Sequence, residues 1–167
     1  GPGQTEVFID GMGVATGIAF NAEGTLFVGD RSGGIFAVDP HGATRRFAKL
    51  PASVAAYHLA LGPDGDLYVT APTLSNDDPV FRISPRGTVS RSFEHLARPQ
   101  GLAFDRDGNL FVVAIHQGER GIFRIGSDGK ATLVVAGENL VGLAFDGRGR
   151  MVIASTNAIY RLAWSGS

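Results

Sequence analysis

The sequence of 167 residues contains no cysteine. This absence excludes disulfide bonds, a thiolate nucleophile, and zinc or iron-sulfur sites built on cysteine. The chain also has no marked excess of positive or negative charge, because 15 Lys and Arg residues nearly balance 16 Asp and Glu residues. Without a basic patch we expect no nucleic-acid partner. No apolar stretch approaches the roughly 18 residues of a membrane span, so we also expect no membrane insertion.

The composition is typical of a soluble globular domain, with 44% hydrophobic residues and 24 glycines. The opening Gly1-Pro2-Gly3 resembles the scar left by a protease, so we interpret residues 1–4 as a cloning remnant and residues 5–167 as the domain. The absence of cysteine is compatible with export.

One phrase occurs four times in the chain. It reads GIAFNAEGTLFV at Gly17, HLALGPDGDLYV at His58, GLAFDRDGNLFV at Gly101 and GLAFDGRGRMVI at Gly142. The copies recur about every 42 residues, a period that is typical of propeller blades and of solenoids. We therefore expect the chain to be built from four copies of one structural unit.

Each copy predicts four short strands. A short apolar segment, a polar turn ending in Gly and a β-branched or aromatic run form a hairpin. A third apolar strand follows, such as Gly34 to Val38, and the first three copies add a fourth, such as Thr44 to Phe47. No segment of useful length has apolar residues at helical spacing. These patterns predict an all-β propeller of four four-stranded blades, whose first strands begin near residues 17, 58, 101 and 142.

The two ends of the chain leave two arrangements open. Residues 5–9 (TEVFI) occupy the position of a fourth strand, while the last copy stops after its third strand at Leu162 to Trp164. The N-terminal strand could complete the last blade and close a four-bladed ring. Alternatively, the chain is the C-terminal part of a six-bladed propeller. Its open blade edges would then allow a homodimer.

The segments GLAFDRDGNLFVVA and GIFRIGSDGKATLVVAG carry a family resemblance. They resemble the NHL-type repeat and the related propellers of the senescence marker protein, gluconolactonase and luciferin-regenerating enzyme group. The resemblance spans essentially the whole chain and implies the propeller fold, usually with six blades. More narrowly, it implies a module of an exported bacterial multidomain protein of unassigned function, and therefore an extracellular or periplasmic location.

The lactonases of this group bind a divalent ion through a glutamate, an asparagine and an aspartate. Their asparagine lies in a Pro-Asn-Gly-Leu phrase, and the matching phrase here is Pro99-Gln100-Gly101-Leu102, with Gln100 in its place. No Glu-Gly-Pro phrase of the kind that supplies their glutamate is present in the sequence. Both departures weaken the expectation of lactonase activity.

Candidate site residues follow from the geometry of a propeller, in which the residues before each first strand and after each second strand meet at one end of the channel. His58 can serve a site there, or it can replace the glycine of the other copies and bond to a neighbouring loop. His116 likewise can face the channel or lie in a solvated loop. The candidate ligand-binding set is Asp30, Arg31, Tyr57, His58, Gln100, His116, Gln117, Ser155 and Asn157.

Two functions are weighed at this point, and a structural spacer in a longer exported protein is a third possibility. The first is a noncatalytic module that binds a protein, a glycan or a small-molecule ligand at one face, because no recognised catalytic constellation is present. The alternative is a metal-dependent lactonase or lyase-like enzyme, a hydrolase of the gluconolactonase type, that uses the central channel. The sequence does not establish a cofactor. For the enzymatic alternative, the candidate cofactor is a divalent cation such as Ca, Mg or Zn.

Overall fold

A computed structural model describes residues 3–162 of the chain. Every regular element in this range is a β-strand, so the range contains no helix that could cross a membrane. The strands form four antiparallel sheets. Blade 1 consists of β1 (Ala15–Phe20), β2 (Leu26–Asp30), β3 (Gly34–Val38) and β4 (Thr44–Lys49). Blade 2 consists of β5 (His58–Leu61), β6 (Leu67–Thr70), β7 (Asp78–Ile83) and β8 (Val89–Leu96). Blade 3 consists of β9 (Leu102–Phe104), β10 (Leu110–His116), β11 (Glu119–Ile125) and β12 (Ala131–Ala136). Blade 4 consists of β13 (Leu140–Phe145), β14 (Met151–Ser155) and β15 (Ile159–Leu162).

The first turn of each blade explains the repeated phrase. In blade 3, one oxygen of Asp105 accepts hydrogen bonds from the backbone amides of Asp107 at 3.0 Å and Asn109 at 2.8 Å. Gly108 follows with a φ of 82°, a left-handed conformation that glycine adopts without steric cost. The aspartate and the glycine together reverse the chain, so the phrase specifies the hairpin that joins the first two strands.

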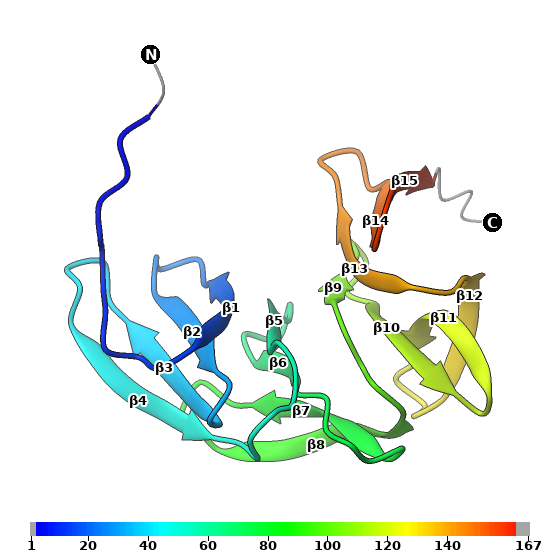
Figure 1. Ribbon diagram of the computed structural model, residues 1–167, viewed down its shortest axis with the longest axis horizontal. Helices are drawn as coiled ribbons and strands as arrows, with labels where there is room; N and C mark the ends of the chain where they lie inside the picture. Colours follow the sequence, from blue (N-terminus) through cyan, green and yellow to red (C-terminus); the bar gives the residue numbers. More distant parts are fainter. Residues whose placement is uncertain (1–2, 163–167) are drawn as a thin grey trace.

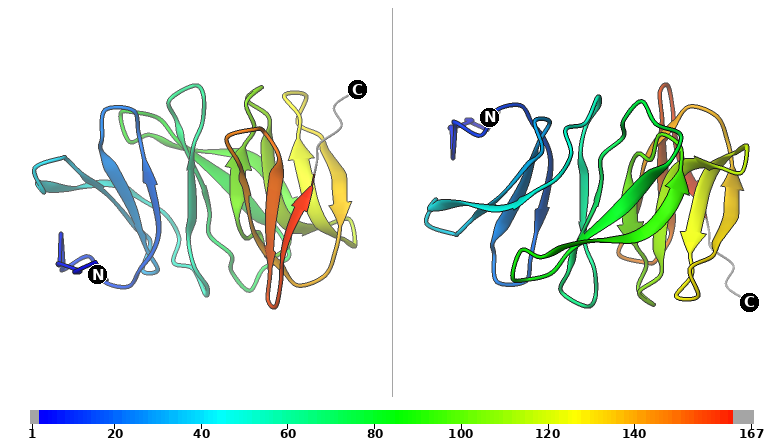
Figure 2. Two further views of the ribbon diagram at one scale, coloured as in Figure 1. Left: turned by 90° about the horizontal axis from the view of Figure 1, so that it is seen from above. Right: turned by 90° about the horizontal axis from the view of Figure 1, so that it is seen from below.

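The four blades stand side by side around a common axis. Neighbouring first strands contact one another, from β1 to β5, from β5 to β9 and from β9 to β13. The fourth strands β4, β8 and β12 lie on the outer rim (Figure 1). Two further views show the blades stacked face against face along the arc (Figure 2). This arrangement confirms the predicted all-β propeller with four blades.

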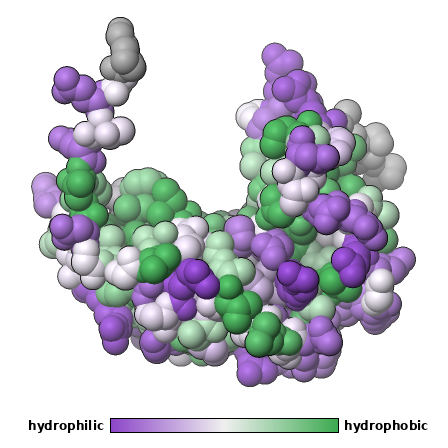
Figure 3. Space-filling view, viewed as in Figure 1, coloured by the Kyte–Doolittle hydropathy of each residue, from purple (hydrophilic) through white to green (hydrophobic). Residues whose placement is uncertain are grey.

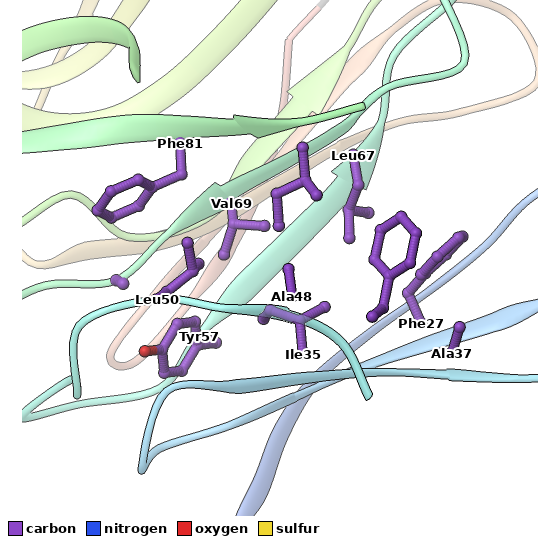
Figure 4. Packing of buried hydrophobic residues seen from close by; sticks show 12 residues of the cluster. Phe27, Ile35, Ala37, Ala48, Leu50, Tyr57, Leu67, Val69 and Phe81 are labelled. Atoms are coloured by element: carbon purple, nitrogen blue, oxygen red, sulfur yellow. The ribbon is translucent and has the colours of Figure 1, made fainter. Parts of the chain in front are cut away.

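Apolar cores lie between successive blades. Figure 4 shows the first core, in which Phe27 and Ile35 of blade 1 meet Leu67 and Phe81 of blade 2. A second core joins blades 2 and 3, and a third joins blades 3 and 4. Because each blade buries its faces against its neighbours, the blades hold one another in place.

Of the two arrangements that the sequence leaves open, closure by the N-terminal strand is not formed in the described residues. Residues 5–9 form no strand, and Val7 is 80% exposed. Blade 4 has three strands within the described range. The first and last blades lie at opposite ends of an open arc (Figure 1), and the space-filling view shows the wide recess between them (Figure 3). Residues 1–2 of the proposed cloning remnant, and Trp164 of the predicted last strand, lie outside the described residues.

On the face of blade 1 that points away from blade 2, the apolar side chains of β1 are exposed, whereas Val28 of β2 is buried. On this face Ile18 is paired with Val28, and Phe20 with Leu26. Ile18 is 63% exposed and Phe20 is 61% exposed. The sequence predicts Phe20 to be a packing residue like Phe104, but no preceding blade covers it in the described residues. An uncovered apolar sheet face of this kind favours association.

We therefore predict that the chain self-associates in solution through this face. Light scattering at high protein concentration should give a mass above the 17.5 kDa of one chain. A double variant with Ile18→Lys and Phe20→Lys should return to the monomer mass, because two charges on the face oppose its burial. Leu74→Lys is the control, since Leu74 is 90% exposed in a loop away from β1. A monomeric unmodified chain would contradict the prediction.

Candidate functional site

The first strands of all four blades line a cavity of about 200 Å³ that is open to solvent at the centre of the arc. Residues at the start of each first strand line it, including Gly17 of β1, His58 of β5, and Gly142 of β13. Gly101, which immediately precedes β9, also lines it. The cavity therefore lies where the sequence places the channel.

Glycine at this position allows neighbouring first strands to approach closely. A Cβ atom added to Gly17 would lie 2.3 Å from the carbonyl oxygen of Tyr57. A Cβ atom added to Gly101 would lie 2.6 Å from the Cα atom of Gly142. Both distances are too short for real atoms, so the backbones require glycine there. His58 is the exception among the four copies, and its imidazole lies at the boundary between blades 2 and 3.

The imidazole of His58 is chemically unusual in two respects. Its Nε2 atom is buried and has no hydrogen-bond partner among the described residues. Burial lowers the pKa of His58 below its usual value of 6.5, while a side-chain hydrogen bond with Gln100 partly opposes this shift. The imidazole is therefore neutral at pH 7. A buried polar atom without a partner costs about 1–3 kcal/mol, which points to a ligand, a water molecule or a functional role.

Tyr57 and Asp30 support the structure beside this cavity. Tyr57 is fully buried, and its hydroxyl donates a hydrogen bond to the carbonyl of Pro51. Burial, together with the negative charge of Asp30, raises the pKa of Tyr57 to about 12. Asp30 accepts hydrogen bonds from the amide of Val14 at 3.0 Å and from the hydroxyl of Ser32. The hydroxyl of Tyr57 and the carboxylate of Asp30 thus already have hydrogen-bond partners within the protein.

The pKa of Asp30 reflects these contacts. Burial acts to raise the pKa of this carboxyl group, but the hydrogen bonds from Ser32 and Val14, together with the nearby charge of Lys49, outweigh burial and lower it. Asp30 is therefore an ionised anchor for the segment that leads into β1. Arg31 turns away from it, since its guanidinium donates to the carbonyl of Val54 at 3.0 Å.

His116 does not join His58 at the channel. Its ring packs edge-on between Phe93, at a centroid distance of 5.7 Å, and Phe123, at 5.6 Å. It lines a different cavity, between β8 and the hairpin of β10 and β11. Gln117 forms the tight turn of that hairpin with a left-handed φ of 51°. The sequence did not reveal that β10 continues as far as His116, which carries the ring away from the channel.

The side chains of Ser155 and Asn157 form hydrogen bonds within their own loop. The hydroxyl of Ser155 lies 3.0 Å from the side-chain oxygen of Asn157 and accepts a hydrogen bond from the amide of Ala158 at 3.1 Å. These bonds close the turn between β14 and β15. Of the nine predicted site residues, the structure thus brings together Tyr57, His58 and Gln100.

A second cavity, of about 240 Å³, adjoins the first between blades 3 and 4. Gln100 lines this second cavity and also bonds to His58 of the first. The sequence analysis missed the other polar residues on its wall. They are Arg98, Arg120, Asn139 and Thr156. The signal that could have found Arg98, Asn139 and Thr156 is their position before the first strands or after the second strands of blades 3 and 4, whereas Arg120 lies in β11, the third strand of blade 3.

The described residues do not by themselves form a metal cage. No group of three His, Asp or Glu side chains within residues 3–162 is arranged to bind a metal ion. His58 and Gln100 provide one imidazole and one amide, whereas calcium and magnesium prefer several carboxylate or carbonyl oxygens. The donor set therefore does not fit a divalent ion without ligands from elsewhere, and the chemistry below uses none.

Comparison with known structures places the chain among gluconolactonase-like β-propellers in fold. A gluconolactonase from Xanthomonas campestris is 22% identical, with a TM-score of 0.70 over 92% of this chain and 60% of the other. Virginiamycin B lyase from Staphylococcus aureus, in a catalytically inactive histidine-to-alanine form, is 20% identical, with a TM-score of 0.69 over 93% and 54%. Regucalcin from Agrobacterium tumefaciens, described as a calcium-binding protein, is 17% identical, with a TM-score of 0.70 over 92% and 58%.

These similarities have two limits. The chain spans little more than half the length of each of these three proteins. No protein-family model and no curated protein matches the sequence. At such identities the shared property is the fold alone: the described part of this chain is an arc of a β-propeller.

Proposed function

We propose that the channel end around His58 is the substrate site of a hydrolase or lyase that acts on a small polar molecule such as a sugar lactone. The observation that carries this proposal is the buried, unpartnered Nε2 atom of His58 at the channel wall. Two structural neighbours named for an activity, a gluconolactonase and a lyase, support the enzymatic alternative over a noncatalytic module.

The chemistry assigned to His58 is proton transfer. A neutral imidazole accepts a proton through an unprotonated nitrogen, and its lowered pKa keeps that nitrogen unprotonated at pH 7. The hydrogen bond with Gln100 orients the ring. In lactone hydrolysis, His58 takes a proton from water as the water oxygen bonds to the carbonyl carbon. The ring C–O bond then breaks, and the proton passes to the departing alkoxide, which leaves the hydroxy acid as product.

The cofactor and partner predictions also belong to this proposal. A divalent cation would need oxygen ligands in addition to His58 and Gln100, and its presence remains a prediction. The extracellular or periplasmic location and the binding of a protein or glycan likewise remain predictions.

The proposal predicts that His58→Ala removes catalysis without unfolding the protein. Proton release from a panel of sugar lactones, glucono-δ-lactone among them, should be faster with the unmodified chain than in buffer. The variant should fall to the buffer rate. Its free energy of unfolding should change by no more than about 1 kcal/mol, since removal of an unpaired buried nitrogen offsets the lost packing.

His41→Ala is the matched control, because His41 is exposed in the turn between β3 and β4. It should keep the full rate. Equal rates for the unmodified chain and His58→Ala on every lactone that is turned over would contradict the role of His58.

A further inference from the structure

The cavity between blades 3 and 4 contains two arginines whose charges are not neutralised. Neither the guanidinium of Arg98 nor that of Arg120 has a hydrogen bond or ion pair among the described residues. No carboxylate is among the residues that line this cavity. Among the described residues, Arg82, Arg91 and Arg150 do have acidic partners, whereas Arg98 and Arg120 are exposed and unpaired. The wall of the cavity therefore carries two positive charges and no negative one.

The backbone at Arg98 is held in a conformation that arginine disfavours. Its φ is 50°, in the left-handed region where glycine is the usual residue. It also precedes Pro99, which restricts its backbone further. Asn139, which also lines the cavity, has a φ of 58°, a conformation that asparagine tolerates better than arginine does. Strain of this kind is found where a side chain is needed at a particular place.

The remaining polar groups on the wall suit the same ligand. The side chains of Gln100, Asn139 and Thr156 offer amide and hydroxyl donors around the two guanidinium groups. Arginine presents a planar fork of donors that matches the oxygens of a carboxylate or phosphate. The volume of about 240 Å³ is large enough for one such group and part of the molecule that carries it.

We propose that this cavity binds the anionic oxo group, a carboxylate or phosphate, of a small ligand, with Arg98 and Arg120 as its principal contacts. The site adjoins the His58 cavity, with Gln100 between them. It therefore fits a ligand that has its charged group between blades 3 and 4 and its uncharged part at the channel. The inference does not depend on His58 acting as a base.

The test is a titration of the chain with inorganic phosphate, and in parallel with acetate, at constant ionic strength adjusted with sodium chloride. Amide NMR signals of Gly121 and Gly137, which line the cavity, report binding. We expect saturable shifts with one or both anions and none with chloride. Tighter binding of phosphate or of acetate identifies which oxo group the site prefers.

Arg98→Gly is the decisive variant. Glycine relieves the backbone strain, so the melting temperature should stay equal or rise, while affinity for the anion should fall at least fivefold. Arg120→Gln should weaken binding by a similar factor. Arg86→Gln removes one charge from the turn between β7 and β8 and should leave binding unchanged. Shifts that do not saturate, or equal affinities in Arg98→Gly and the unmodified chain, would overturn the proposal.

Discussion

Replacement of Gly101 by alanine is expected to destabilise the protein by about 2–3 kcal/mol. The new Cβ atom would lie 2.6 Å from the Cα atom of Gly142 and 3.1 Å from the carbonyl oxygen of Val141. Both are backbone atoms, so no side chain can rotate to relieve the overlap. The strand β13 would have to move away from β9, and overpacking of this kind costs stability.

Gly142→Ala is the matched control, because Gly142 occupies the same place in the next copy of the repeat. The nearest atom to its added Cβ is the Cβ of Ala154 at 3.9 Å, an ordinary contact. We expect a change below about 0.5 kcal/mol. Urea denaturation of both variants measures the difference. Equal stabilities for the two variants would show that first strands do not approach closely at the channel.

Phe111→Ala is expected to have the largest effect on stability, about 3–5 kcal/mol. Phe111 is 1% exposed and lies in the core between blades 3 and 4. Its ring centroid is 5.2 Å from that of Phe145. Since a domain is stable by only about 5–15 kcal/mol, this variant should be close to unfolding at 25 °C.

The control for Phe111 is Phe20→Ala on the open face of blade 1. Phe20 is 61% exposed, so its truncation should cost less than about 1 kcal/mol. Chemical denaturation, monitored by far-UV circular dichroism, measures the stability of both variants. A loss at Phe20 as large as that at Phe111 would mean that another surface covers blade 1 in solution.

The sequence predicted the blades because each one is specified locally. Asp105 and Gly108 determine a turn within four residues, and the same pattern at Asp146 binds the amides of Arg148 and Arg150. Turns and alternating strands depend on near neighbours in the chain, so a repeat reveals them. The third strand predicted from Gly34 to Val38 agrees with β3.

Contacts between distant segments were harder to predict. Residues 5–9 have the pattern of a strand, but pairing with β15 requires the two ends of the arc to meet. Phe20 matches Phe104 in sequence, yet only Phe104 has a blade in front of it, where it contacts Tyr68. Both observations have the same cause, which is that the sequence pattern does not reveal how far the arc closes.

Only part of the candidate site could be derived from the sequence, for a related reason. His58 and Gln100 lie at the starts of first strands, whose positions the repeat determines. His116, Arg98 and Arg120 depend on the length of the hairpin between β10 and β11 and on an unusual backbone at Arg98. Neither feature follows from the repeated phrase, because these segments differ between copies.

The proposed proton transfer by His58 can be tested most directly by the pH dependence of kcat/KM for a lactone that the unmodified chain hydrolyses, after subtraction of the buffer rate. Because burial lowers the pKa of His58 below 6.5, the neutral base is present at pH 7 and is lost only as the pH falls through that lowered value. We expect kcat/KM to be level near neutrality and to fall with a one-proton slope at a pH below 6.5, and we expect His58→Ala to lack this step. A step at or above 6.5, or the same step in His58→Ala, would contradict the assignment of His58 as the base.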